Sequence, residues 1–242
     1  MPAARHHSSG SAARRQRFGR KLRAWYRAHH RDLPWRRTRD PYQVLVSELM
    51  LQQTQVSRVV ERYADFLSRF PSLEHVARSP LGRVMEAWSG LGYYARARHL
   101  HQLARSVVRD HGAVLPSHPR TLSELPGIGA YTAGAVACFA YGRRAALVDT
   151  NVARVLRRAF APTLDATSST GRGAIWRIAE SLLPRTGRAA YDHNQGLMEL
   201  GALVCTARLA HCHRCPVRAE CTTGRRTRQA AYSGAGVVAS KS

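Results

Sequence analysis

The sequence predicts an all-α protein. Apolar residues recur at helical spacing along most of the chain, whereas the alternating pattern that is typical of strands is nearly absent. Hydrophobic residues make up 44% of the 242 residues, which is enough to form a folded core. No run of about 18 apolar residues is present, so we expect no membrane span.

Each expected helix follows from a face of apolar residues or from a residue that starts or stops a helix. The first helix carries Phe18, Leu22, Trp25 and Tyr26, and Pro34 breaks the chain after it. A second begins after Pro41, and its apolar face continues through Leu45, Leu49, Val56, Val60 and Tyr63. Further helices are expected at 73–77, 81–89, 95–110, 121–125, 130–140, 151–160, 171–183 and 192–204.

The chain is strongly basic. It has 38 Lys and Arg against 15 Asp and Glu, a formal net charge of +23. This excess predicts a polyanionic partner, either nucleic acid or an acidic membrane surface, with nucleic acid favoured. A general preference for arginine in the source genome is the alternative explanation.

Four of the five cysteines form one short cluster, Cys205-x6-Cys212-x2-Cys215-x5-Cys221. Four thiolates in a single loop can bind one tetrahedral metal ion or one cubane iron–sulfur cluster. Zinc sites usually contain two separated Cys-x2-Cys pairs, and only one such pair is present, which makes zinc the weaker interpretation. The crowding of the cysteines also favours a reducing compartment over a set of disulfides.

Two further segments carry polar groups in a suggestive pattern. In Leu125-Pro126-Gly127-Ile128-Gly129, two glycines precede a helix, so that backbone N–H groups can approach a phosphate closely, although an ordinary turn has the same pattern. Glu48, Gln52 and Gln55 share one stripe of an otherwise apolar helix, either as a solvated face or as a site.

These motifs together resemble one family. The cysteine spacing resembles the iron–sulfur loop of endonuclease III and of MutY-type adenine glycosylases, and the glycine segment resembles the hairpin of a helix-hairpin-helix motif. The segment at 48–56, Glu-Leu-Met-Leu-Gln-Gln-Thr-Gln-Val, is similar to the MutY-type segment nearly letter for letter. The resemblance extends from about Phe18 to Cys221 and implies a two-lobed helix-hairpin-helix DNA glycosylase fold with a [4Fe–4S] cluster bound by the four cysteines.

The resemblance also implies an activity and the residues for it. The enzyme would hydrolyse the N-glycosidic bond of adenine mispaired with guanine or 8-oxoguanine and leave an abasic site. Glu48 would protonate the leaving adenine, for which burial must raise a glutamate pKa from about 4.3. Asp149 would stabilise the cationic sugar, in addition to a plain role as helix N-cap, and Asn151 would orient it. Tyr131 stands where bifunctional relatives place lysine, so a monofunctional enzyme is expected.

Other positions match the family's DNA and base contacts. Gly127 and Gly129 would contact the DNA backbone, and Gln53, Leu91 and Tyr93 would form a wedge that fills the space left by an extruded base. The residues expected to contact the substrate are Trp35, Arg36, Gln52, Gln53, Thr54, Leu91, Tyr93, Gln195 and Glu199. Each of these has a packing or surface role as its alternative.

The expected organisation assigns each stretch of the chain a place. Residues 1–15 and 222–242 are expected to be disordered tails, 16–40 an N-terminal helix packing with the cluster lobe, 41–145 the lobe with the hairpin, and 146–221 the cluster lobe. Glu48 and Asp149 are expected to face each other in a cleft. MutY-type relatives usually continue into a domain that recognises 8-oxoguanine, and this sequence ends soon after Cys221, so lesion discrimination is expected to rest on the wedge.

The expected partner is double-stranded DNA with a mismatched or damaged base, bound by a monomeric, cytoplasmic, nucleoid-associated protein. Two alternatives remain open from the sequence. One is a thymine or uracil mismatch glycosylase on the same scaffold, and the other is a non-catalytic iron–sulfur protein that only binds DNA.

Overall fold

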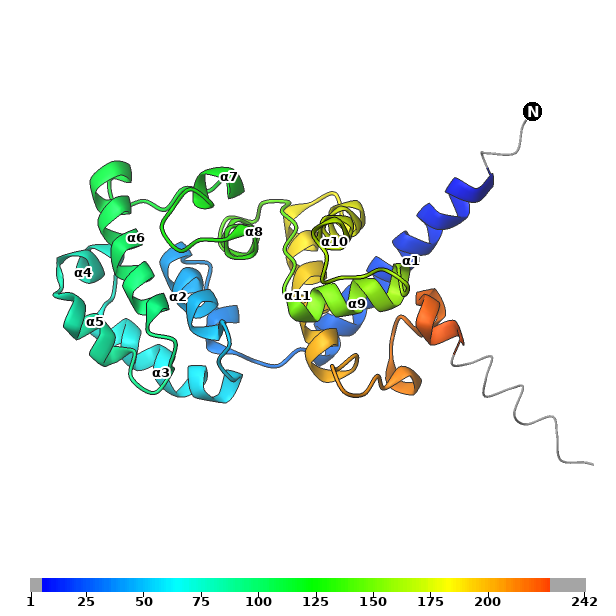
Figure 1. The fold of residues 1–242 in the computed structure, drawn as a ribbon, viewed down its shortest axis with the longest axis horizontal. Coiled ribbons are helices and arrows are strands. Elements are labelled where there is room, and N and C mark those ends of the chain that lie inside the picture. The colour runs from blue at the N-terminus through cyan, green and yellow to red at the C-terminus, as the bar shows by residue number, and fades with distance from the viewer. Residues whose placement is uncertain (1–5, 227–242) are drawn as a thin grey trace, which may run out of the picture. The chain divides into compact units, whose positions relative to one another are not determined.

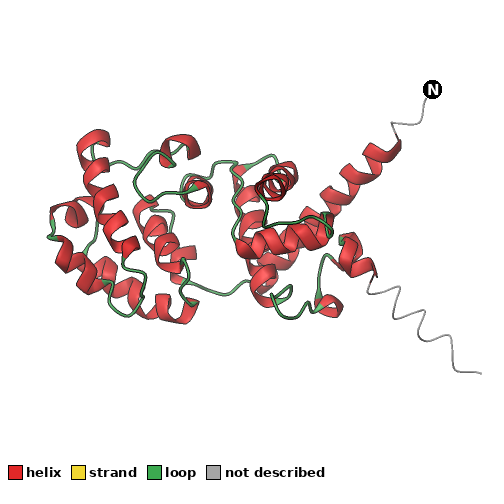
Figure 2. Cartoon of the chain, viewed as in Figure 1, coloured by secondary structure: helices red, strands yellow, loops and turns green. Residues whose placement is uncertain are grey.

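The structure of the protein is a computed structural model that describes residues 6–226, with side chains described from residue 12 onward. Within this range the chain is helical apart from loops and one isolated bridge between Cys205 and Ala210, which confirms the predicted all-α fold (Figure 2). No described helix is both long enough and apolar enough to cross a membrane. Of the tails predicted at 1–15 and 222–242, residues 1–5 and 227–242 lie outside the described residues.

The chain divides into two compact units, which are described separately. Unit 1 consists of Met1–His30 and Ala146–Ser242, and unit 2 of Arg31–Ala145. Unit 1 contains α1 (His6–His29), α9 (Thr150–Phe160), α10 (Ser169–Leu182), α11 (Gly187–Leu203), η2 (Cys212–Arg214) and η3 (Arg218–Glu220) (Figure 1). Unit 2 contains η1 (Pro34–Arg36), α2 (Pro41–Leu51), α3 (Val56–Arg69), α4 (Leu73–Arg78), α5 (Leu81–Ala87), α6 (Ala95–His111), α7 (Pro119–Leu122) and α8 (Ala130–Phe139).

The core of unit 1 forms where α1 packs along α11 and where α9 packs against α10 and α11. Phe18 and Leu22 of α1 are fully buried, and Phe18 meets Phe160 edge-on with ring centroids 5.0 Å apart. Gly196 allows the close approach of α1, since a Cβ there would lie 3.1 Å from Leu22 Cγ. The predicted apolar face of the first helix is therefore the face that packs.

Some residues that were predicted to lie in disordered tails are part of unit 1 at both ends of the described chain. Helix α1 begins at His6 instead of near residue 16, and the Arg14 guanidinium donates to the carbonyl oxygens of Ala159 (2.6 Å) and Glu220 (2.7 Å). At the other end, the hydroxyl of Thr222 donates to the carbonyl of Ala159 at 2.8 Å. These contacts join segments distant in sequence, so local composition gave no sign of them.

The core of unit 2 surrounds α2, which packs against α3, α6 and α8. Phe66 and Trp88 are fully buried and meet edge-on with centroids 5.5 Å apart. The segment after α1 also belongs to this unit, because Trp35 of η1 packs edge-on against Tyr63 at 5.6 Å. Residues 31–40 therefore differ from the expectation that the whole of 16–40 packs with the cluster lobe.

The predicted second helix is interrupted. Helix α2 ends at Leu51 and α3 begins at Val56, because Gln52 is extended and Gln53 adopts a left-handed conformation with φ +55°. The interruption changes which face of the second part is buried, so that Val60 is 40% exposed. Most other predicted helices agree with the structure within a few residues, although the one expected at 121–125 lies earlier, as α7.

The buried imidazole of His193 is expected to make the stability of the fold sensitive to acid. It is completely buried in α11, and neither ring nitrogen has a hydrogen-bond partner among the described residues. Burial, with a smaller effect from Arg23, lowers the pKa of His193 from 6.5 to about 3. Between these values the unfolded chain binds a proton that the folded chain does not, so stability falls as the pH drops below about 6.5.

We expect the free energy of unfolding to fall by about 2 kcal/mol from His193 alone between about pH 7 and pH 5. Thermal denaturation at both pH values, for the native protein and for His193→Leu, measures this contribution. The variant should lose less stability on acidification than the native protein. An identical pH dependence of the two proteins would show that His193 is not the cause.

Candidate active site

Helix α2 carries a buried carboxyl group in unit 2. The Asp40 side chain accepts a hydrogen bond from the Gln43 N–H at 3.0 Å, and Pro41 occupies the first turn, which fixes where the helix begins. Two turns later, Glu48 lies inside the unit and is only 3% exposed. The alternative of a solvated polar face is therefore wrong for this residue.

Glu48 is held by the helix that follows the glycine hairpin. Tyr131, in the first turn of α8, donates its hydroxyl to Glu48 Oε2 at 2.8 Å. Directly after the end of α2, the Gln52 side-chain amide donates a hydrogen bond to the Thr132 hydroxyl at 3.3 Å. Two separate hydrogen bonds to α8 thus hold the predicted site residues Glu48 and Gln52, one of them donated by the predicted site residue Tyr131.

The hairpin before α8 requires glycine for two reasons. Gly127 has φ +74°, a conformation that other residues rarely adopt, and a Cβ there would lie 2.5 Å from the Cβ of His99. Gly129 is the N-cap of α8, makes no side-chain cap, and a Cβ at this position would meet nothing within 4 Å. Gly129 and Ala130 are exposed, so the start of α8 is accessible, as a phosphate-binding helix terminus requires.

Asp149 in unit 1 acts as the N-cap of α9. Its Oδ1 accepts from the Val152 N–H at 2.6 Å, and its Oδ2 accepts from the Asn151 side-chain amide at 3.0 Å. The carboxylate is half-buried and fixed by both bonds. The capping interpretation is therefore correct, and the role of Asn151 in orienting Asp149 for catalysis stays a prediction.

Sequence reasoning missed the arginine that supports this carboxylate. Arg154 of α9 donates to Asn151 Oδ1 at 2.7 Å and to the carbonyls of Gly201 and Cys205, both at 2.8 Å. A Cβ at Gly201 would lie 2.7 Å from the Asn151 Cβ, so glycine permits this packing. Arg154 thereby connects the Asp149–Asn151 pair to the first of the four clustered cysteines.

The residues predicted as a wedge occupy two turns of unit 2. Gln53 and Tyr93 both have left-handed backbones, with φ +55° and +45°, and both side chains are exposed, Tyr93 to 60%. Leu91 differs from the prediction because its side chain is buried, and only its carbonyl contributes, accepting from the Thr54 hydroxyl at 3.2 Å. Arg96, which sequence reasoning did not single out, lies between the two turns.

The residues predicted to contact adenine fall into both units. Trp35 is buried in unit 2, and Arg36 donates to the Arg31 carbonyl at 2.8 Å. Gln195 and Glu199 are buried on α11 of unit 1, with Glu199 fully enclosed. Their contacts with substrate stay a prediction.

The four clustered cysteines lie close enough for their charges to interact. Burial raises the pKa of the Cys215 thiol to about 12, and the nearby Cys221, Cys205 and Cys212 add to the shift. Burial also raises the pKa of Cys221, with Cys205 and Cys212 contributing. Such thiols bind a metal only if the metal replaces their protons, and a set of four is suited to iron or zinc.

The cysteine loop offers four thiols as possible ligands, and two of their sulfur atoms accept hydrogen bonds. Among the described residues, no three or more Cys, His, Asp or Glu side chains are arranged to hold one metal ion. Two sulfur atoms also accept hydrogen bonds at 3.3 Å, Cys205 from Arg158 and Cys221 from the Gly224 N–H, as is common in iron–sulfur sites.

Sequence comparison gives the family. The model of the HhH-GPD superfamily of base excision DNA repair proteins matches residues 46–180, more than half of the chain. The chain belongs to the HhH-GPD superfamily. The match includes Glu48, the glycine hairpin and Asp149, so these residues lie within the part of the chain that the HhH-GPD proteins share.

Two curated relatives of this HhH-GPD protein are named adenine DNA glycosylase. That of Rattus norvegicus is 41% identical over 96% of this chain and 46% of its own length. That of Mycobacterium tuberculosis is 46% identical over 81% of this chain and 64% of its own length. The chain thus spans about half to two-thirds of these relatives. Their names confirm the resemblance to MutY-type adenine glycosylases.

A solved structure confirms the expected HhH-GPD fold. A thermostable thymine-DNA glycosylase superposes with a TM-score of 0.81 at 32% identity, covering 88% of this chain and 98% of the other. The all-helical glycosylase fold predicted from the sequence is therefore correct.

Proposed function

We propose that this protein hydrolyses the N-glycosidic bond of adenine mispaired with guanine or 8-oxoguanine in duplex DNA. The main support for this proposal is the buried Glu48, which accepts a hydrogen bond from Tyr131, a residue that directly follows the glycine hairpin. The similarity to adenine DNA glycosylases supports adenine as the base. The bond between the base and C1′ breaks, water adds its oxygen to C1′, and the products are free adenine and an abasic site.

Glu48 supplies the proton that the leaving adenine needs. A base leaves its sugar as a poor anion unless a nitrogen of the ring is protonated, so a positioned general acid lowers the barrier. The Tyr131 hydroxyl fixes the direction of the carboxyl group, and burial keeps bulk water from competing for its proton.

Asp149 stabilises the positive charge that develops on the deoxyribose. A fixed carboxylate stabilises an oxocarbenium-like transition state electrostatically or by covalent capture. The bonds from Val152 and Asn151 hold the group before the reaction begins, so it does not need to reorganise. Trp35, Arg36, Gln195 and Glu199 are proposed to line the adenine pocket.

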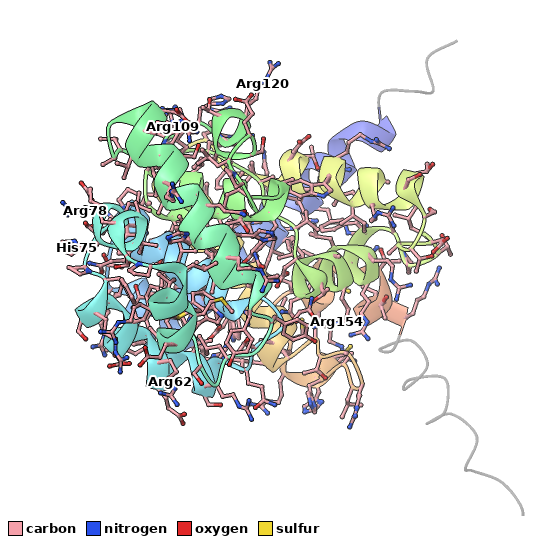
Figure 3. The ribbon with its side chains drawn as sticks, turned by 60° about the vertical axis from the view of Figure 1, so that its left-hand side comes forward. Arg62, His75, Arg78, Arg109, Arg120 and Arg154 are labelled. Carbon is pink, nitrogen blue, oxygen red and sulfur yellow. The ribbon has the colours of Figure 1, made fainter. Side chains whose placement is uncertain are left out.

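DNA binding rests on the hairpin and on the charge of the chain. The N–H groups at the start of α8, after Gly127 and Gly129, are proposed to bind a phosphate of the backbone. Exposed arginines on unit 2, among them Arg62, Arg78 and Arg120, add sequence-independent attraction (Figure 3). Gln53 and Tyr93 are proposed to fill the space left by the extruded base.

The four cysteines are proposed to hold a [4Fe–4S] cluster. When bound, the cluster would cross-link the loop and add folding energy, with no part in hydrolysis. The loop is already tied to unit 1, since Lys21 of α1 pairs with the buried Glu220 at 3.0 Å. Arg154 ties Cys205 to the pair of Asn151 and Asp149.

A thymine or uracil mismatch glycosylase is the second candidate function. The solved thymine-DNA glycosylase, which this chain matches over 98% of that protein's length, favours it. The two functions differ only in the base released, so an assay of base choice separates them.

The deciding experiment incubates the protein with duplexes that contain A:8-oxoguanine, A:G, T:G or U:G pairs and then cleaves abasic sites with alkali. Strand breaks at the adenine of the first two duplexes are expected. Breaks only at thymine or uracil would favour the second candidate. Binding of all four duplexes without any break would indicate a DNA-binding protein that is not an enzyme.

Tyr131 predicts that the enzyme lacks strand-cleaving activity. A tyrosine hydroxyl cannot form the imine that a lysine forms with the opened sugar, and the chain contains only two lysines, Lys21 and Lys241. Strand breaks should therefore require alkali or heat, and borohydride should trap no protein–DNA adduct. Gel analysis with an endonuclease III-type lyase as positive control measures this. Efficient trapping would contradict the monofunctional assignment.

A further inference from the structure

The two exposed turns that carry Gln53 and Tyr93 share one buried cation, Arg96. The residue lies in the first turn of α6 and is 6% exposed, although an arginine is seldom buried without strong partners. Burial lowers its pKa from the ordinary value. The acceptors of its hydrogen bonds are backbone carbonyls and one hydroxyl. The guanidinium group therefore binds mainly the backbone of neighbouring segments.

One set of hydrogen bonds from Arg96 caps the C-terminal end of helix α2. Its Nη1 donates to the carbonyls of Leu49 (2.9 Å), Met50 (2.7 Å) and Gln52. The last carbonyls of a helix have no partner within the helix and carry partial negative charge. The guanidinium therefore caps α2 at the residue immediately before Gln53.

The other set fixes the second turn. Nη2 donates to the Leu91 carbonyl (3.0 Å), the Gly92 carbonyl (2.9 Å) and the Thr54 hydroxyl (3.0 Å). Nε donates to the Tyr93 carbonyl at 3.3 Å, and the guanidinium lies 5.6 Å from the centroid of the Tyr93 ring. The Arg96 side chain thus forms hydrogen bonds with both exposed turns, the one that contains Gln53 and the one that contains Tyr93.

Both turns are conformationally unfavourable without such support. Gln53 and Tyr93 are non-glycine residues with positive φ, and such backbones persist where surrounding contacts determine them. A planar guanidinium with five donors can bond several carbonyls at once, whereas a lysine ammonium has three donors at a single point.

We propose that Arg96 is a positioning residue that holds Gln53 and Tyr93 as one preformed wedge, so that base extrusion does not have to order two separate loops. The inference rests on the proposed function. Arg96 would assist the unstacking of the base, which precedes the proton transfer. It would act through Gln53 and Tyr93 and would not contact the reacting atoms.

The test compares the native protein with Arg96→Lys on two substrates under single-turnover conditions. One substrate is an A:G duplex, and the other carries the same adenine in a single-nucleotide bulge, where no pairing opposes extrusion. We expect Arg96→Lys to lower the rate about tenfold or more on the duplex and much less on the bulge, because an unpaired base needs less help to unstack. A 2-aminopurine beside the target reports unstacking by its fluorescence, independently of base release.

Three controls make the outcome specific. Arg105→Lys, on the exposed face of the same helix, should behave like the native protein. In a Tyr93→Ala background, Arg96→Lys should add little further loss if the two residues act as a unit. Thr54→Val, which removes one acceptor of Arg96, serves as a milder variant if Arg96→Lys does not fold.

Native rates for Arg96→Lys on both substrates would overturn the proposal. An equal loss on duplex and bulge, with unchanged 2-aminopurine unstacking, would also overturn it and assign Arg96 a general structural role. If the native protein releases no base from any substrate, the proposed function fails, while the 2-aminopurine signal and duplex affinity still test the wedge.

Discussion

Replacing Glu48 with glutamine should abolish adenine release and leave affinity for the mispaired duplex within a few-fold of the native value. Glutamine has the same shape and can accept the hydrogen bond from Tyr131, but it has no acidic proton to donate to the leaving base. Loss of a general acid typically lowers a rate by about 10²–10⁴. Single-turnover assays of base release, with affinity measured separately, give both quantities.

The matched control for this variant is Glu61→Gln. Glu61 lies on the exposed surface of α3 in the same unit, so the change removes one negative charge without touching the buried site. It should release adenine at the native rate. Native turnover by Glu48→Gln would assign the proton donor to another group and remove the main support for the proposed mechanism.

Replacing Cys212 with serine should remove iron from the protein and greatly lower the yield of folded chain. A serine oxygen is a poor replacement for a thiolate ligand, and binding energy lost at such a site is also folding energy lost. The native protein should show broad absorbance near about 400 nm, as thiolate-ligated iron–sulfur clusters do. Metal analysis and thermal denaturation of both proteins measure the effect.

The fifth cysteine provides the control. Cys138 is fully buried in α8 of unit 2, outside the cysteine loop, so Cys138→Ala should keep the iron content of the native protein. Its stability should fall only as far as the small cavity requires. Zinc without iron in the native protein would contradict the cluster assignment and favour a single-ion site.

Local sequence signals account for most of the candidate site. Pro41 and Asp40 mark the start of α2, and Glu48 stands out as a polar residue in this otherwise apolar helix. The two glycines before α8 predict a hairpin because one of them requires positive φ. Asp149 can be recognised as an N-cap from its position before an apolar helix, and the side chain that caps is the one proposed for catalysis.

The residues that the sequence did not reveal act through distant partners. Arg96 bonds carbonyls more than forty residues earlier in the chain, and Arg154 bonds the Cys205 carbonyl about fifty residues later. In a chain with 38 Lys and Arg residues, nothing local separates the buried Arg96 and the half-buried Arg154 from the arginines on the surface. The interruption after Leu51 escaped prediction for the same reason, since a left-handed glutamine has no distinct sequence signal.

The sequence by itself determined the helical class, the hairpin, the spacing of the four cysteines and the positions of Glu48 and Asp149. These features depend on neighbours within a few residues, through helical periodicity, capping and the conformational freedom of glycine. The tertiary structure decided which polar side chains are buried and which groups they bind. Tyr131 donates a hydrogen bond to Glu48, Arg154 donates one to Asn151, and Arg96 donates several to the two exposed turns. Burial strengthens such bonds and makes an unpaired group costly, so their partners are set by packing across the fold.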